Sequence, residues 1–174
     1  TPLYSSAASD VYKRQLLGSA YTALDATIAR LDTRRNLLGE KLGDTQSVQL
    51  RLADVAAHLD AAETLLLRDV ARTAVGYGSG RGLSVVDRAV CRRNQAYCAQ
   101  LVFEAVGSLL YRGGAHGLRE GDAVQRAYRD VGAGVTHVGT DWDVWGRIHG
   151  KALMGHDIAT PNFGFHPAEV VRTR

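Results

Sequence analysis

The residues whose types and spacing best suit catalysis lie in the segment 124–155. One of its two histidines, His137, follows the pair Arg129-Asp130 by about two helical turns. An imidazole can exchange a proton near neutral pH, and a neighbouring carboxylate can fix its tautomer. Asp141, one turn further along, could supply that carboxylate, and Asp130 could do so less easily. The pattern makes His137 a candidate catalytic residue, although an exposed histidine bonded to Asp141 is the plainer interpretation.

Other residues could bind a ligand, but each has an ordinary structural explanation. Gly113 and Gly114 would end a helix, and they would also allow a ligand to approach the backbone closely. Arg126 and Asp130 form an i,i+4 pair that contributes only a few tenths of a kcal/mol if it is exposed. Arg93 falls on the apolar side of an expected helix, where it either extends to solvent or binds an anion such as phosphate.

Composition argues against several classes of function. Neither a CxxC nor an HxxxH spacing occurs, so we expect no metal site. The net charge of +3 is small and the arginines are scattered among acids, so we expect no nucleic-acid partner. No apolar run approaches the ~20 residues of a membrane span. Cys91 and Cys98 are too far apart along a helix for a disulfide, and we expect them in the core of a cytoplasmic protein.

Four long periodic segments would position these residues. Their apolar residues recur every three or four positions, which is typical of helices with one buried face. Short glycine-containing breaks separate them, and this arrangement predicts an all-α, antiparallel four-helix bundle. The expected helices cover residues 15–42, 45–75, 84–112 and 124–155, the last of them unbroken. Ser84, with Asp87 three residues later, and Asp122 are expected to cap the third and fourth helices.

The two ends of the chain do not share this periodicity. Residues 1–14 do not begin with Met and resemble a translated sequencing adapter. We therefore treat them as a non-native or disordered leader, and we expect the chain to be a C-terminal fragment of a longer protein. The bundle domain is expected to cover residues 15–155. Residues 156–174 contain two prolines and are expected to form an extended tail.

The order of motifs resembles the C-terminal bundle of the acyl-CoA dehydrogenase superfamily over residues 15–155. The shared features are a GG turn, a short loop, the run V-Q-R-A-Y-R-D and a long helix that ends in L-M-G. In dehydrogenases of this family the R-D pair precedes a Y-E-G-T segment, whose glutamate removes the substrate α-proton. Counting from Asp130 places His137 at the tyrosine and Val138 at the glutamate. Valine cannot accept a proton, so the comparison weighs against dehydrogenation.

The histidine variant is similar to the oxygenase components of two-component flavin-dependent monooxygenases. This resemblance implies that His137 lies beside the ring of a reduced flavin, FMN or FAD. There it would support formation of a C4a-hydroperoxyflavin or deprotonate a phenolic substrate. The resemblance also implies that Gly113 and Gly114, with Arg126 and Asp130, contact flavin bound by an adjacent subunit of a homotetramer.

Further partners follow from the same resemblance: a separate flavin reductase and a small organic substrate, whose identity the sequence does not give. The domains that hold most of the flavin would lie outside this fragment, so the fragment alone is expected to be inactive. Two alternatives remain open. One is an acyl-CoA dehydrogenase-type flavoprotein that oxidises a CH–CH bond with a relocated base. The other is a non-catalytic helical oligomerisation module.

Overall fold

A computed structural model describes residues 3–112 and 119–158. Every regular element in these ranges is a helix. Apart from the helices, these ranges contain one isolated β-bridge, between Arg35 and Lys41, so the all-α prediction is confirmed. They are α1 (Leu3–Thr33), η1 (Leu42–Asp44), α2 (Gln46–Gly78), α3 (Val85–Arg112), α4 (Ala123–Val135), η3 (Val138–Thr140) and α5 (Trp142–Leu153), where η denotes a short 3-10 helix.

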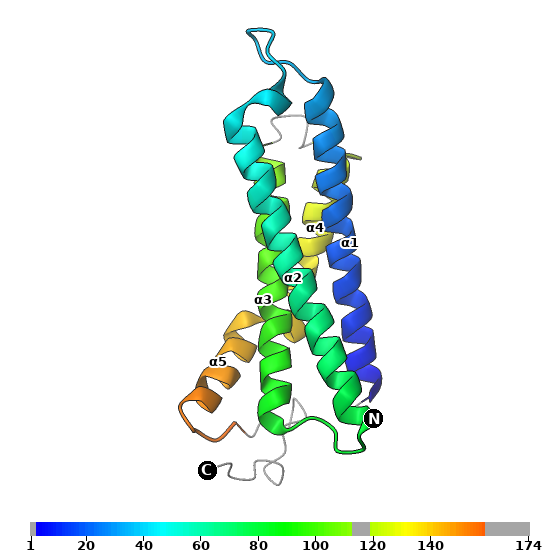
Figure 1. The fold of residues 1–174 in the computed structure, drawn as a ribbon, viewed down its shortest axis with the longest axis vertical. Coiled ribbons are helices and arrows are strands. Elements are labelled where there is room, and N and C mark those ends of the chain that lie inside the picture. Colours follow the sequence, from blue (N-terminus) through cyan, green and yellow to red (C-terminus); the bar gives the residue numbers. More distant parts are fainter. Residues whose placement is uncertain (1–2, 113–118, 159–174) are drawn as a thin grey trace.

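Helices α1 to α4 form the expected antiparallel bundle. They run along one long axis, and each runs opposite to the helix before it in the chain (Figure 1). The main packing pairs are α2 with α3, α1 with α4, and α3 with α4. The short helix α5 diverges from the bundle at its lower end and packs against α3 (Figure 1).

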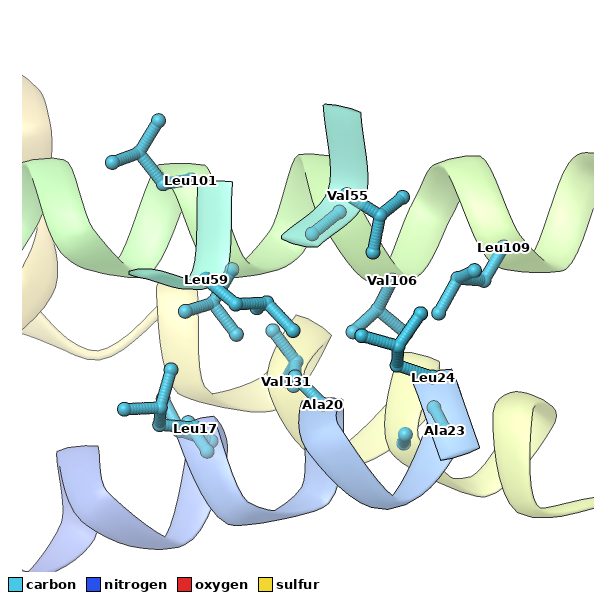
Figure 2. Packing of buried hydrophobic residues seen from close by; sticks show 14 of the residues in the cluster. Leu17, Ala20, Ala23, Leu24, Val55, Leu59, Leu101, Val106, Leu109 and Val131 are labelled. Carbon is cyan, nitrogen blue, oxygen red and sulfur yellow. The ribbon is translucent and has the colours of Figure 1, made fainter. Parts of the chain in front are cut away.

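The bundle core lies where all four helices meet. Leu59 of α2, Val106 of α3 and Val131 of α4 are fully buried there (Figure 2). α1 contributes the small, fully buried residues Ala20 and Ala23, which let its backbone approach the other helices closely. Burial of these apolar side chains supplies the main driving force for the association of the helices.

A second, smaller core joins α3 to α5. It contains Val85, Ala89 and Ala96 of α3, together with Trp145 and Ile148 of α5. The segment after α5 closes this core, because the side chain of its residue 158 is buried within it. The expected extended tail over residues 156–174 lies outside the described residues from residue 159 onward.

The first helix is shorter at its C-terminal end than expected. α1 ends at Thr33, not near residue 42, and Leu38 is 83% exposed. The side-chain oxygen of Asn36 accepts hydrogen bonds from the backbone N–H groups of Leu38 and Glu40, at 2.9 and 3.0 Å. Gly39 adopts a positive φ of 82°. These local bonds compete with the helical ones, so our prediction for the end of this helix was wrong.

At the other end, α1 begins at Leu3 and runs through the boundary that we expected at residue 15. Residues 3–14 therefore continue the helix. The assignment of residues 1–14 as a non-native leader stays a prediction.

A buried polar cluster ties α2 to α3. The carboxylate of Asp69 belongs to a residue only 4% exposed, and Asn94 donates to its two oxygens at 3.1 and 2.9 Å. Arg68 lies 3.3 Å from the same carboxylate. The side-chain oxygen of Asn94 accepts a hydrogen bond from the Nε of Arg93 at 2.9 Å, so Arg93 is bound to Asn94. The cluster satisfies polar groups that would otherwise be costly to bury.

The expected caps of the third and fourth helices are confirmed. The Ser84 hydroxyl accepts from the backbone N–H of Asp87 at 3.0 Å and lies 2.7 Å from the Asp87 carboxylate. Asp122 accepts from the backbone N–H of Val124 at 2.9 Å. Its other oxygen lies 2.7 Å from the guanidinium of Arg30, so the cap of α4 is also an ion pair with α1.

Replacing Asp122 with alanine is expected to lower the free energy of unfolding by about 1–2 kcal/mol. The loss combines a helix cap with a partly buried ion pair. Urea denaturation measures it. The matched variant Asp122→Asn keeps an acceptor for the cap but removes the charge, so it should lose less. Equal losses in the two variants would contradict a contribution from the cap.

Candidate functional site

The candidate site is centred on a turn, not on a helix. We expected one unbroken helix over residues 124–155, and this prediction was wrong. α4 ends at Val135, and the backbone forms the short 3-10 helix η3 before α5 begins at Trp142. His137 and Val138, which we placed on a helix, therefore lie in the connection between two helices.

Polar side chains explain why the helix ends here. The hydroxyl of Thr140 lies 2.6 Å from the carbonyl oxygen of Gly134 and 2.8 Å from that of His137. Asp141 accepts from the backbone N–H groups of Asp143 and Val144 and so caps α5. Each bond satisfies a backbone group that a helix end leaves without an intrahelical partner. Sequence reasoning missed this break, although an aspartate just before an apolar-periodic segment is a common signal for a helix start.

His137 caps the η3 turn through its own ring. It is exposed, and its Nδ1 accepts from the backbone N–H of Gly139 at 3.0 Å. A ring nitrogen that accepts a hydrogen bond carries no proton, so the neutral imidazole holds its proton on Nε2. The tautomer is thus set by a backbone amide, whereas the acid–base hypothesis gave this role to a carboxylate, Asp141 or, less easily, Asp130. The carboxylate of Asp141 serves as the cap of α5.

A surface groove opens beside this turn. Its volume is about 310 Å³, which is near the lower end of the range for small-molecule sites. It lies between α3 and the segment from α4 to α5, and it includes Thr140 of the turn. Three lining residues are aromatic or apolar, namely Phe103, Val135 and Trp142. The other three are polar, namely Gln100, Glu104 and Thr140.

None of the predicted site residues in the described ranges lines the groove, His137 included. Arg126 and Asp130 are both exposed on α4, and no ion pair joins them among the described residues. Neither side chain lines the groove. Gly113 and Gly114 lie outside the described residues. Contact of any of these four residues with a cofactor stays a prediction.

Two further titratable side chains are buried away from the turn. Desolvation, followed by the charge of Asp69, raises the pKa of the Cys91 thiol to about 11, so the thiol stays protonated and is a poor nucleophile. Burial, assisted by the charge of Arg93, lowers the pKa of His149. Both side chains therefore favour their neutral forms at neutral pH, which suits a role in packing.

Neither a metal centre nor a membrane segment emerges from the described part of the chain. Within residues 3–112 and 119–158, no three His, Cys, Asp or Glu side chains are grouped closely enough to hold a metal ion. None of the helices in these ranges is long and apolar enough to cross a membrane.

Comparison with known proteins identifies flavin-dependent relatives. The oxygenase component of an FADH(2)-dependent resorcinol hydroxylase from Rhizobium sp. (strain MTP-10005) is 35% identical over 148 residues, covering 80% of this chain and 36% of that protein. The HsaA oxygenase subunit of a flavin-dependent monooxygenase from Rhodococcus jostii (strain RHA1) is 29% identical over 128 residues, covering 72% of this chain and 34% of that protein. This chain therefore spans little more than a third of the length of these relatives.

Solved structures share the fold. The crystal structure of 3-HSA hydroxylase from Rhodococcus sp. RHA1 superposes with a TM-score of 0.78 and 26% identity, covering 87% of this chain and 40% of that chain. The family described as acyl-CoA dehydrogenase, C-terminal domain, matches residues 12–142, well over half of this chain. The match confirms the resemblance seen in the sequence: the chain belongs to the acyl-CoA dehydrogenase C-terminal domain family.

Proposed function

We propose that this chain is the C-terminal helical part of the oxygenase component of a two-component flavin-dependent monooxygenase. The observation that carries the proposal is the His137–Thr140 turn. Counted from Asp130, its histidine and valine correspond to the tyrosine and glutamate of dehydrogenases of the family. Val138 is 49% exposed and can take up no proton. The similarity to a resorcinol hydroxylase over 80% of the chain supports the same conclusion.

The groove beside the turn fits part of a reduced flavin, either FMN or FAD. Phe103 and Trp142 offer flat apolar surfaces for an aromatic ring, while Gln100 offers polar atoms for its edge. The flavin would supply the oxygen chemistry, and the protein would supply binding, orientation and a dry environment. A bound reduced flavin would supply the two electrons with which one oxygen atom enters the substrate and the other leaves as water.

His137 would act as a hydrogen-bond donor. Its Nδ1 accepts from the N–H of Gly139, so in the neutral ring Nε2 carries the proton that would be donated to a bound molecule. Acting as a base through Nδ1 would require breaking the bond that holds the turn. The geometry therefore favours donation to the flavin or to the reacting oxygen over deprotonation of a phenolic substrate.

The complete protein would need further partners. We propose a separate reductase that delivers reduced flavin, a small aromatic substrate, and assembly into a homotetramer in the cytoplasm. Apolar side chains exposed along α2, among them Leu50, Leu67 and Val75, are compatible with burial against other parts of such an assembly. In that assembly Gly113, Gly114, Arg126 and Asp130 would contribute to flavin binding.

The proposal is tested with the full-length protein, a flavin reductase, resorcinol as the first substrate and ¹⁸O₂. We expect one ¹⁸O atom per molecule of hydroxylated product, and no product when the reductase is omitted. Reduction of bound flavin by an acyl-CoA, without oxygen incorporation, would instead favour the dehydrogenase alternative. A full-length protein that binds no flavin would favour the oligomerisation module.

A further inference from the structure

Trp145 is buried at the junction of α3 and α5. The residue is only 3% exposed, and it packs in the small core with Ala89 and Ala96 of α3. The guanidinium of Arg92, also on α3, lies over its ring at 5.2 Å from the ring centroid. Such a contact between a cation and an indole face is attractive. The indole is thus held on several sides, and its orientation is fixed by the packing of the two helices.

The indole reaches back to the turn that carries His137. Its Nε1 donates to the carbonyl oxygen of Val138 at 2.7 Å. The same peptide group, at its other end, carries the N–H of Gly139 that donates to Nδ1 of His137 at 3.0 Å. Two hydrogen bonds therefore connect the buried indole to the imidazole through a single planar peptide.

We propose that Trp145 is a positioning residue for His137. Its bond to the Val138 carbonyl sets the plane of the Val138–Gly139 peptide and so aims the amide N–H at Nδ1. A hydrogen bond at the carbonyl also polarises the peptide, which strengthens the N–H as a donor. The result is an imidazole held as the Nε2–H tautomer. The positioning of His137 by Trp145 is inferred from these contacts alone. Its consequence for catalysis rests on the function proposed for His137.

The first test uses the unsubstituted full-length protein. Hydrogen exchange of indole N–H groups, followed by NMR, should show strong protection at Trp145 relative to Trp142, which is 38% exposed. Exchange at Trp145 as fast as at Trp142 would overturn the proposal. This comparison does not depend on whether any variant folds.

The second test replaces Trp145 with phenylalanine, which keeps an aromatic ring and removes the N–H. With histidine labelled by ¹⁵N, the Nε2–H tautomer should dominate at His137 in the unsubstituted protein at a pH where the ring is neutral. The signal is assigned by its absence in His137→Ala. In Trp145→Phe the bias toward this tautomer should be lost, and in the matched variant Trp142→Phe it should remain. An unchanged tautomer in a folded Trp145→Phe protein would contradict the proposal.

The yield of product distinguishes the positioning role of Trp145 from the function proposed for His137. In Trp145→Phe the yield of product per reduced flavin should fall, by up to about 100-fold, the cost that a misplacement of about 1 Å can carry. A lost tautomer bias with an unchanged yield would overturn the catalytic consequence of the positioning. Absence of oxygenation in the unsubstituted protein would overturn the proposed function and leave the tautomer result standing.

Discussion

Replacing His137 with alanine in the full-length protein is expected to lower product formation by about 10²–10⁴-fold, the range over which a positioned proton donor or acceptor contributes. The variant lacks the Nε2–H that the Gly139 amide holds in place. Without this donor, reduced flavin and oxygen should still react, but they should yield oxidised flavin and hydrogen peroxide. Product and peroxide measured per reduced flavin consumed give both parts of the prediction.

Two variants make this experiment specific. His156→Ala removes another exposed histidine, outside the turn, and should leave the yield unchanged. His137→Asn keeps a side chain that can accept from the Gly139 N–H and still offers an N–H of its own. It should therefore recover part of the yield if His137 acts as a donor. A yield as low as that of His137→Ala would favour a base, and normal coupling in His137→Ala would remove His137 from the mechanism.

Replacing Asn94 with leucine is expected to lower the free energy of unfolding by about 3 kcal/mol, the upper end of the cost of leaving a buried polar group unsatisfied, because the group is a carboxylate. The substitution leaves the carboxylate of Asp69 buried between α2 and α3 without its two bonds from Asn94. Arg68 remains nearby, but its side chain is about half exposed and its single contact is long, at 3.3 Å. Urea denaturation of the variant and the unsubstituted protein measures the difference.

The double variant Asp69→Leu/Asn94→Leu is the matched control. It replaces both polar partners with apolar groups of similar size, an exchange that is often nearly neutral. Its stability should therefore exceed that of Asn94→Leu alone. A loss below about 1 kcal/mol in Asn94→Leu, or a double variant less stable than it, would show that the carboxylate does not depend on Asn94.

The parts of the fold that could be predicted from the sequence depend on local signals. The stripe on α2 that includes Val55 and Leu59 is buried as its spacing predicts, and both cysteines of α3 are buried. The caps at Ser84 and Asp122 follow from residue types beside each helix. In these segments the apolar periodicity and the capping residues indicate the same helices, so the prediction was reliable.

The prediction failed where periodicity and side-chain hydrogen bonding disagree. Apolar spacing continues from Val135 through Val138 to Trp142, which indicates a continuous helix. Thr140 and His137 nevertheless bond to nearby backbone groups and end it. Spacing alone does not show which of the two local structures is more stable, because both use neighbouring residues.

Contacts between helices could not be predicted at all from one sequence. The bond from Asn94 to Asp69 joins residues 25 positions apart and depends on the register of α3 against α2. The bond from Trp145 to the Val138 carbonyl depends on the break between α4 and α5, where the chain forms the η3 turn. The candidate histidine was therefore recognisable from its neighbours, whereas the contacts that orient it were not.

The turn between α4 and α5 also bears on how this family can diversify. Residues 137 and 138 have exposed side chains and belong to neither buried core, so exchanging them costs the bundle little packing energy. An ancestor could therefore replace a proton-accepting side chain at this point without rebuilding the helices around it. The frame would stay constant while the reaction changed, which is how one scaffold comes to serve unrelated chemistries.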